Sequence, residues 1–184
     1  MTAEAFPIGG REGGPRFWTG RRKRLYAAYA ALAVLACGYG ELDSWSESHL
    51  FLVNSSASLP NWAFLIAKGA EARRGDYIFF DPPRSVLVQR HFGAQPKVFG
   101  KIVYGSAGDH VTRAGRTFFI NGKPVAVAKP RSLSGEPLAL GPTGTIPPGC
   151  HFVGTPHKDG LDSRYAAIGW ICRRRIIGTG SAIL

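Results

Sequence analysis

The chain has 184 residues, of which 45% are hydrophobic, and it carries a formal net charge of +11. A chain of this length can bury one sizeable core, and it is too short for two full-sized domains with linkers. Its 24 glycines and 13 prolines are spread along the whole chain. They divide it into short segments of the kind that build β-sheets, which disfavours a helix bundle.

The positive charge invites a nucleic-acid interpretation, because clustered Lys and Arg residues neutralise phosphates. Most of the clustered basic residues instead precede a single apolar run, and these are Arg11, Arg16, Arg21, Arg22, Lys23 and Arg24. The remaining basic residues are dispersed, apart from a second group at 173–175. Basic residues that flank a membrane segment stay in the cytoplasm. We therefore expect no nucleic-acid partner and interpret residues 1–24 as a basic cytoplasmic segment.

The apolar run is "LYAAYAALAVLACGYG", residues 25–40, and acidic residues follow it. It is shorter than the roughly 20 residues that a spanning helix needs, but snorkelling basic residues and the following Leu42 can lengthen it. We expect a single membrane anchor over residues 25–45, which places residues 46–184 outside the cytoplasm. Two alternatives share this evidence: a cleaved secretory signal, and a lipoprotein signal in which "VLAC" ends at Cys37.

Beyond residue 45 the pattern changes from helical to extended. Short segments are rich in β-branched and aromatic residues and are bounded by Gly, Pro, Asn or Asp, as is typical of strands. These segments lie at 49–53, 76–83, 97–105, 117–125, 151–155 and 168–180. Asn121 and Gly122 form the strongest short-range hairpin signal, whereas the Pro- and Gly-rich stretch 129–149 predicts a long loop. The sequence therefore predicts a mainly β fold for this part of the chain.

The stretch "NSSASLP", residues 54–60, places several serines just after the strand predicted at 49–53. Ser58 is followed two residues later by Pro60, which is typical of a turn. A serine at the tip of a turn, with its backbone N–H free, is placed as a nucleophile needs to be. Ser, Asn and Pro also cluster in ordinary turns, so this stretch alone does not define a site.

A candidate base lies in "GKIVYGSAGDHV", residues 100–111. Lys101 opens an apolar strand, where we expect its amine to be partly desolvated. Desolvation lowers the pKa of a lysine, and a neutral lysine can accept a proton from a serine hydroxyl. The alternative is that Lys101 extends from the strand to reach water, as long basic side chains do.

A third stretch, "GLDSRYAAIG", contains Asp162, Ser163 and Arg164. Taken in order, the S-x-P serine, the lysine and this D-S-R resemble the serine/lysine signal peptidase family over most of the chain beyond the anchor. The sequence "NSSASLP" is similar to the N-x-[ST]-x-S-x-P motif of the conjugative-transfer signal peptidases, the TraF branch. The resemblance implies a signal-peptidase-like β domain preceded by one N-terminal transmembrane helix.

The resemblance also implies a role for each candidate site residue. Ser58 would be the nucleophile and Lys101 the general base of a Ser/Lys dyad. The backbone N–H of Ser58 and the hydroxyl of Ser56 would hold the oxyanion, where losing one donor typically costs about 10² to 10³ in rate. Asp162 and Arg164 would form the supporting pair behind the dyad.

The chain departs from the family pattern at several positions. The family often has a serine two residues before the D-S-R aspartate, where its hydroxyl helps to orient the lysine, and here this residue is Gly160. The usual G-D-N is replaced by residues 154–156, and Ala107 stands where a proline usually follows the lysine strand. We therefore expect another residue to position Lys101, with His157 as one candidate.

The histidines lack metal-ligand spacing, so we predict no metal and no other cofactor. Two cysteines, Cys150 and Cys172, follow the anchor. If the strands at 151–154 and 168–172 pair, the sulfurs could come close enough for a disulfide in an oxidising compartment; otherwise both are buried thiols. Trp62 is expected to stand on an exposed apolar rim that faces the bilayer.

The sequence thus predicts a membrane-anchored serine endopeptidase of the bacterial inner membrane with its catalytic domain in the periplasm. The expected partners are a secreted or pilin-like precursor protein, the lipid bilayer and proteins of a conjugation or secretion apparatus. Cleavage would pass through an acyl-enzyme that water or an amine can resolve, so pilin cyclisation stays open. Two further alternatives are a type I leader peptidase and a non-catalytic, membrane-tethered β domain of a secretion apparatus.

Overall fold

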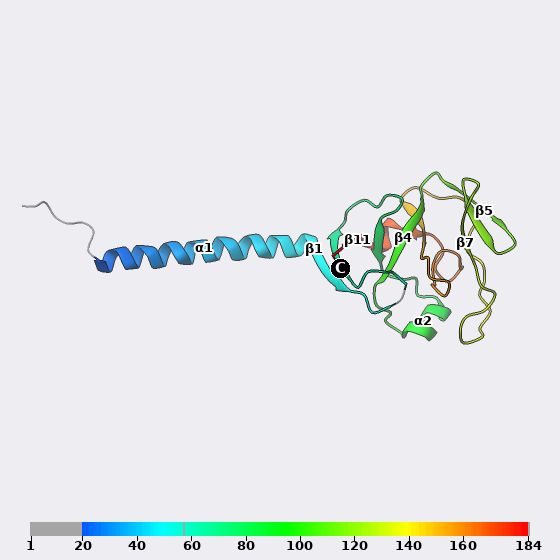
Figure 1. Ribbon diagram of the computed structural model, residues 1–184, viewed down its shortest axis with the longest axis horizontal. Helices are drawn as coiled ribbons and strands as arrows, with labels where there is room; N and C mark the ends of the chain where they lie inside the picture. The colour runs from blue at the N-terminus through cyan, green and yellow to red at the C-terminus, as the bar shows by residue number, and fades with distance from the viewer. Residues whose placement is uncertain (1–19, 57, 184) are drawn as a thin grey trace, which may run out of the picture. The chain divides into compact units, whose positions relative to one another are not determined.

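The computed structural model describes residues 20–56 and 58–183. Most of the expected basic segment, residues 1–24, lies outside this part of the chain. The described chain begins with one long helix and continues as a mainly β domain with two antiparallel sheets (Figure 1), so the predicted fold class is confirmed. The chain divides into two compact units between Trp45 and Ser46.

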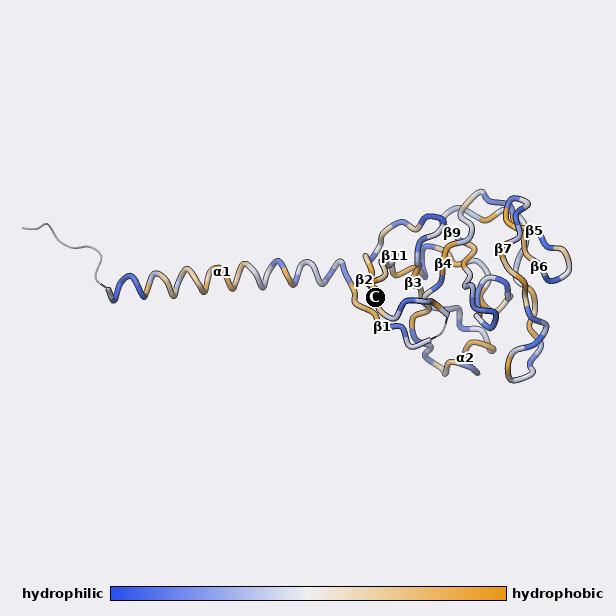
Figure 2. Tube along the Cα trace, viewed as in Figure 1, coloured by the Kyte–Doolittle hydropathy of each residue, from blue (hydrophilic) through white to orange (hydrophobic). Residues whose placement is uncertain are grey.

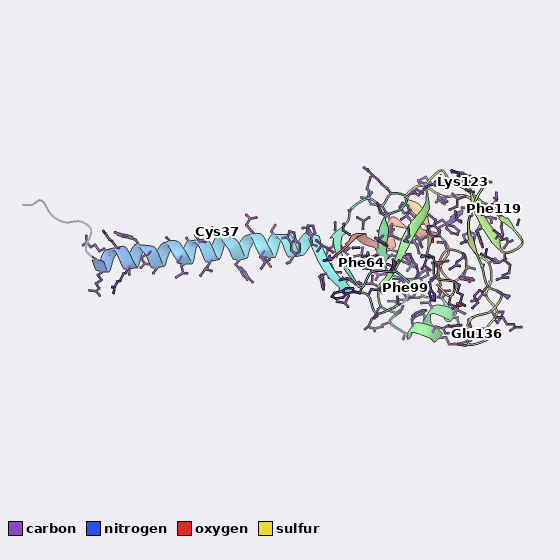
Figure 3. The ribbon with its side chains drawn as sticks, in the orientation of Figure 1. Cys37, Phe64, Phe99, Phe119, Lys123 and Glu136 are labelled. Carbon is purple, nitrogen blue, oxygen red and sulfur yellow. A yellow bond between two sulfur atoms is a disulfide. The ribbon has the colours of Figure 1, made fainter. Side chains whose placement is uncertain are left out.

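The helix α1 spans Gly20–Ser48 and includes the apolar run together with residues on both sides of it. It is the one helix in the described residues that is long and apolar enough to cross a membrane, and none of its residues is buried. Figure 2 shows its hydrophilic start and the apolar residues that follow. Cys37 is exposed on this helix (Figure 3). These features are consistent with a single-pass membrane protein.

The first sheet has the strand order β1-β2-β11-β3-β4-β9-β10. Its strands are β1 (His49–Val53), β2 (Ala63–Lys68), β3 (Tyr77–Phe80), β4 (Phe99–Ser106), β9 (Cys150–Gly154), β10 (Ile171–Cys172) and β11 (Ile176–Ala182). The second sheet has the order β7-β6-β5-β8. Its strands are β5 (His110–Ala114), β6 (Thr117–Ile120), β7 (Lys123–Val127) and β8 (Gly144–Thr145). Within the domain, β5 and β7 lie at the end away from β1 (Figure 1).

The turn that joins β6 to β7 confirms the predicted hairpin. Asn121 and Gly122 occupy it with φ of 51° and 79°, the left-handed backbone that a two-residue hairpin turn of this kind requires. The Pro- and Gly-rich stretch 129–149 is mostly loop, as predicted, with the two-residue strand β8 near its end.

Several elements differ from the sequence prediction. The strands β2 (Ala63–Lys68) and β5 (His110–Ala114) were not predicted. The stretch 168–180, predicted as one strand, is divided into β10 and β11 by a 3₁₀ turn at Arg173–Arg175. The chain thereby changes its pairing partner from β9 to β2 and β3. The short helix α2 (Val86–Phe92) lies between two predicted strands, and Ser85 caps it by accepting a hydrogen bond from the Val88 N–H.

Aromatic residues of the first sheet fix the central strands relative to one another. Phe64 on β2 (Figure 3) and Phe79 on β3 are fully buried, with ring centroids 5.2 Å apart. Gly180 on β11 lies directly against the second ring, because a Cβ there would be only 2.3 Å from Phe79 Cε2. The next strand, β4, carries Lys101 and is paired on both sides, with β3 and with β9. The candidate base therefore lies in the interior of a packed sheet.

A disulfide joins Cys150 on β9 to Cys172 on β10. The two residues face each other in the antiparallel pair, with Cα atoms 3.9 Å apart. Of the two alternatives that the sequence left open, the structure contains the bridge rather than two thiols. Such bonds persist in secreted and periplasmic proteins and are rare in the cytosol.

Candidate active site

Ser58 lies in the loop that closes the hairpin of β1 and β2. The Asn54 N–H donates a hydrogen bond of 2.7 Å to the carbonyl oxygen of Trp62, just beyond the last strand pair. The Asn54 side-chain amide donates two more, of 3.1 Å to the Leu59 carbonyl and 2.9 Å to the Asn61 carbonyl. A single asparagine therefore ties the start of the loop to its end.

The same asparagine orients the serine cluster. Its Oδ1 accepts hydrogen bonds from the Ser56 N–H (3.0 Å) and the Ser56 hydroxyl (3.1 Å). The Oγ atoms of Ser56 and Ser58 lie 2.7 Å apart, where either hydroxyl can donate. The two serines named from the sequence are thus direct neighbours. From the sequence, Asn54 was identified only as the first residue of the N-x-[ST]-x-S-x-P motif and was given no role, although a polar side chain that opens a tight turn is a recognisable signal.

Lys101 lies on β4 and is only 4% exposed. Its Nζ lies 5.8 Å from the centre of the Phe99 ring (Figure 3), two residues earlier on the same strand. Burial lowers the pKa of Lys101 from 10.5 to about 8. The Asp162 carboxylate opposes this lowering of the pKa, and the Arg164 guanidinium adds to it. Lys101 is therefore desolvated, as expected, and does not extend along the strand into water.

Asp162 and Arg164 form a buried ion pair in the segment after β9. The Arg164 Nε donates to Oδ1 over 2.8 Å and its Nη2 to Oδ2 over 2.7 Å, and both residues are buried. Burial raises the pKa of Asp162, and the hydrogen bonds and charge of Arg164 oppose that rise. The guanidinium also donates to the carbonyls of Val127 and Gly160. The pair thereby holds the segment after β9 against the end of β7.

Ser58 and Lys101 line one groove of about 960 Å³. Most of its other lining residues come from the end of β1, the serine loop, the start of β4 and the segment after β9, and Phe79 of β3, Phe92 of α2 and Leu133 complete it. Among the described residues no hydrogen bond joins Ser58 to Lys101, and the Ser58 hydroxyl is instead paired with Ser56. The structure brings the two candidates to the same groove without a direct contact between them.

The segment after β9 shows how the chain accommodates a glycine at position 160. A Cβ at Gly160 would lie 1.9 Å from the Thr155 Cγ2, so the threonine fills the space that a serine there would need. The Thr155 hydroxyl donates to the Ser58 carbonyl oxygen and accepts from the His157 N–H over 3.2 Å. The His157 Nδ1 accepts a hydrogen bond from the Asp159 N–H. Thr155, which sequence reasoning did not single out, is therefore the residue here that contacts the serine loop.

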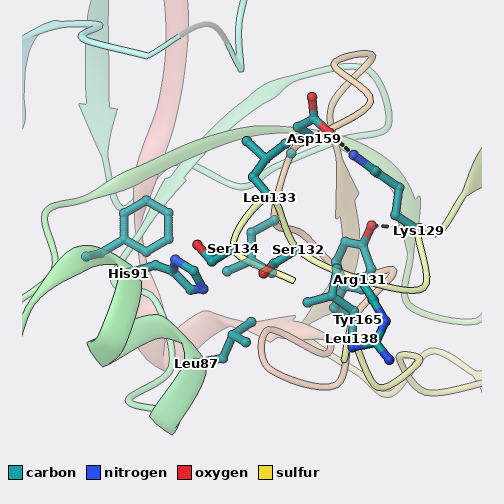
Figure 4. Close-up of a pocket in the computed structure, with 13 residues that line it drawn as sticks. Leu87, His91, Lys129, Arg131, Ser132, Leu133, Ser134, Leu138, Asp159 and Tyr165 are labelled. Carbon is teal, nitrogen blue, oxygen red and sulfur yellow. Dashed lines mark hydrogen bonds and ion pairs between the residues drawn. The ribbon is translucent and has the colours of Figure 1, made fainter. Parts of the chain in front are cut away.

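A second cavity of about 310 Å³ adjoins the groove and shares part of its lining. The shared residues are Phe92, Leu133, Asp159, Gly160 and Leu161. Figure 4 shows Leu87 and His91 of α2 on one side of it, and on the other Lys129, which is ion-paired with Asp159. Leu133, which lines both spaces, is 82% exposed. The two hollows therefore share one wall.

Apolar side chains are exposed on the hairpin that carries the serine loop. Trp62 is 54% exposed, as predicted, and Phe51 on β1 is 57% exposed. Phe64, two residues after Trp62, is fully buried and belongs to the core. Because β1 is an edge strand of its sheet, this apolar surface lies at the edge of the sheet.

A mainly β domain thus follows a helix that can span a membrane, and its groove holds a serine cluster beside a buried lysine of lowered pKa. These features fit a membrane-bound peptidase. The family model described as signal peptidase, peptidase S26, matches residues 26–184, and the chain belongs to this family. It is accordingly a signal-peptidase-type serine protease that acts on a precursor protein. A comparison with curated proteins found no match.

Proposed function

We propose that this protein is a membrane-anchored serine endopeptidase in which Ser58 is the nucleophile and Lys101 the general base. The observation that carries the proposal is the buried Lys101, whose pKa falls to about 8 and which lines the same groove as Ser58. A serine hydroxyl is a weak nucleophile until a base accepts its proton, and a neutral amine is such a base. Catalytic hydrogen bonds often tighten only when substrate is bound, so the free enzyme need not show the dyad contact.

In the proposed reaction, the Ser58 Oγ attacks the carbonyl carbon of the scissile amide and its proton passes to the neutral Nζ of Lys101. The carbonyl oxygen becomes an oxyanion, which the Ser58 N–H and the Ser56 hydroxyl stabilise. The C–N bond then breaks, Lys101 gives the proton to the leaving amine, and an acyl-enzyme ester remains. Water attacks this ester with Lys101 again as the base, which releases the product and restores both side chains.

The remaining site residues, Asn54, Asp162 and Arg164, are proposed to act by positioning the serine loop and Lys101. In the free protein Asn54 accepts hydrogen bonds from the Ser56 N–H and from the Ser56 hydroxyl. A hydroxyl has one proton to donate, so the Ser56 hydroxyl would turn from Asn54 to the oxyanion while the bond from its N–H keeps the residue in place. Asp162 and Arg164 neutralise each other and tie the segment after β9 to β7. They are proposed to support the position of Lys101 rather than to transfer protons themselves.

The domain is proposed to lie in the periplasm of a bacterium, with α1 as a single-pass anchor in the inner membrane. The disulfide between Cys150 and Cys172 supports an oxidising compartment. The basic residues that precede the apolar run support a cytoplasmic N-terminus. The exposed Trp62 and Phe51 suit a surface that rests on the bilayer, and a membrane-bound peptidase would meet its precursor there.

The substrate is proposed to be a secreted or pilin-like precursor of a conjugative transfer apparatus, because "NSSASLP" is similar to the motif of the TraF branch. Water would release a linear product from the acyl-enzyme, whereas the amino terminus of the pilin itself would close a ring. Ser56 is exposed and Ser58 only half-buried, so water can reach the ester. We therefore propose hydrolysis as the main outcome, with cyclisation favoured only if the substrate excludes that water.

The test is co-expression of the full chain with candidate precursors, scored by the intact mass of the product. Ser58→Ala and Lys101→Ala should each stop processing while the protein stays folded in the membrane, and the double variant should be no worse than either. The matched controls Ser181→Ala and Lys123→Ala, exposed on β11 and β7, should process normally. The linear mass indicates hydrolysis, and a mass lower by one water indicates cyclisation. Processing by Ser58→Ala would refute the proposal.

A further inference from the structure

We propose that Thr155 is a positioning residue that holds the Ser58 loop against the strand of Lys101, and that its methyl group requires glycine at position 160. This inference rests on the proposed function, because it concerns the geometry of the same dyad. It assigns to one side chain, outside the serine and lysine motifs, the task of setting the distance between nucleophile and base.

The position of Thr155 follows from strand register. Thr155 comes directly after Gly154, which pairs with Ile102 across β9 and β4. Continued by one residue, the antiparallel register places Thr155 level with Lys101. The Thr155 hydroxyl donates to the carbonyl oxygen of Ser58, a residue 97 positions earlier in the chain. One side chain therefore connects the backbone beside the candidate base to the backbone of the candidate nucleophile.

Both hydrogen-bonding roles of this hydroxyl are occupied. It donates to the Ser58 carbonyl and accepts from the His157 N–H, and Thr155 is only 3% exposed. A buried hydroxyl with a fixed donor and a fixed acceptor has one orientation. Its removal leaves the Ser58 carbonyl and the His157 N–H without this hydrogen-bond partner. The serine loop is therefore tied to the β9 end by a bond that water cannot easily replace.

The methyl group of Thr155 and the missing side chain at 160 are sterically coupled. A Cβ at Gly160 would lie 1.9 Å from the Thr155 Cγ2, 3.2 Å from the His157 carbonyl oxygen and 3.4 Å from the Thr155 Cβ. The shortest of these contacts disappears if residue 155 is serine, because serine lacks Cγ2. The remaining distances are tight or ordinary van der Waals contacts. Position 160 can therefore carry a side chain only when position 155 has lost its methyl group.

The first experiment separates the hydroxyl from the methyl group. Thr155→Val keeps the shape and loses the donor, Thr155→Ser keeps the donor and loses the methyl group, and Thr112→Val on the exposed face of β5 is the matched control. For the full chain in detergent, Thr155→Val should lower kcat roughly 10- to 100-fold, the cost of a small displacement at a reacting centre. Its KM should change little, whereas its thermal midpoint should fall, because the Ser58 carbonyl and the His157 N–H each lose a buried partner. Thr155→Ser should keep most of kcat.

The second experiment tests the coupling. Gly160→Ser alone should lose activity through the clash, and adding Thr155→Ser should restore it, whereas adding Thr155→Val should not. A Thr155→Val enzyme with normal kcat would overturn the positioning role. Full activity of Gly160→Ser, or failure of Thr155→Ser to rescue it, would overturn the coupling.

Two further comparisons cover the case of an unstable Thr155→Val variant and separate this inference from the proposed function. If Thr155→Val is too unstable to assay, Thr155→Ala against Thr155→Ser isolates the hydroxyl at smaller volume, with the same expected loss of kcat in the alanine variant alone. Activity in Ser58→Ala would mean that the proposed function fails. An inactive Ser58→Ala beside a fully active Thr155→Val would mean that only the present inference fails.

Discussion

The lowered pKa of Lys101 makes the pH dependence of cleavage a direct test of its role as a base. With a pKa of about 8, about one lysine in ten is neutral at pH 7 and about nine in ten at pH 9. A lysine that kept the ordinary pKa of 10.5 would be neutral in only about three molecules in ten thousand at pH 7. Burial on β4 thus raises the fraction of active base at pH 7 roughly 300-fold.

The assay is kcat/KM for cleavage of a precursor peptide by the full chain in detergent, measured between pH 6 and 10. The rate should rise about tenfold per pH unit at low pH and level off above about 8, because kcat/KM reports the free enzyme's essential base. Lys101→Arg, which cannot lose its proton, should be inactive throughout. His157→Gln, a change of another side chain that lines the same groove, should leave the midpoint unchanged because Lys101 is the proposed base. A flat profile, or a midpoint near 10, would show that a buried Lys101 is not the base.

Two further predictions concern stability and the serine loop. Lys101→Met should be inactive but more stable than the parent at pH 7, by about 3 kcal/mol, because the folded parent buries a charged amine below its pKa. Between pH 8 and 10.5 the unfolded lysine keeps a proton that the folded one has lost, so the parent gains stability as the pH rises. The thermal midpoints of Lys101→Met and the parent, measured across this range, should therefore approach each other. A difference between the two midpoints that does not depend on pH would contradict the reasoning. Asn54→Ala removes the side-chain bonds that organise the loop, and it should lower kcat and destabilise the protein by about 1–3 kcal/mol. Unchanged kinetics in that variant would show that the loop holds its shape without them.

Features fixed by neighbours in the sequence were predictable. Asn121 and Gly122 adopt positive φ because the hairpin turn needs it. Enrichment in β-branched and aromatic residues located the other strands of the first sheet but not β2. Charge and hydropathy likewise indicated a helix that could span a membrane. In the site, the order of the serine, lysine and D-S-R motifs identified Ser58, Lys101 and Asp162 as candidates. The roles of these residues remain predictions.

Features fixed by distant contacts were not predictable. The hydroxyl of Thr155 finds the carbonyl of Ser58 only because the sheet brings the end of β9 beside the serine loop. The turn at Arg173–Arg175 interrupts a continuous strand-like pattern, because the chain must leave β9 and return to pair with β2 and β3. Both outcomes depend on pairing between strands far apart in the chain, for which a local pattern carries no signal.

The proposed site obtains its base from burial rather than from a neighbouring charge. Asp162 and Arg164 act on the pKa of Lys101 in opposite directions, because their charges are opposite, and they lie together as a pair 2.7 Å apart. Their combined field at Nζ is therefore small, and removal of water is the largest cause of the shift. A polypeptide that fills the groove would remove more water and lower the pKa further, toward the pH at which a general base works best. Substrate binding would then increase the population of neutral Lys101 at the moment when Ser58 needs it.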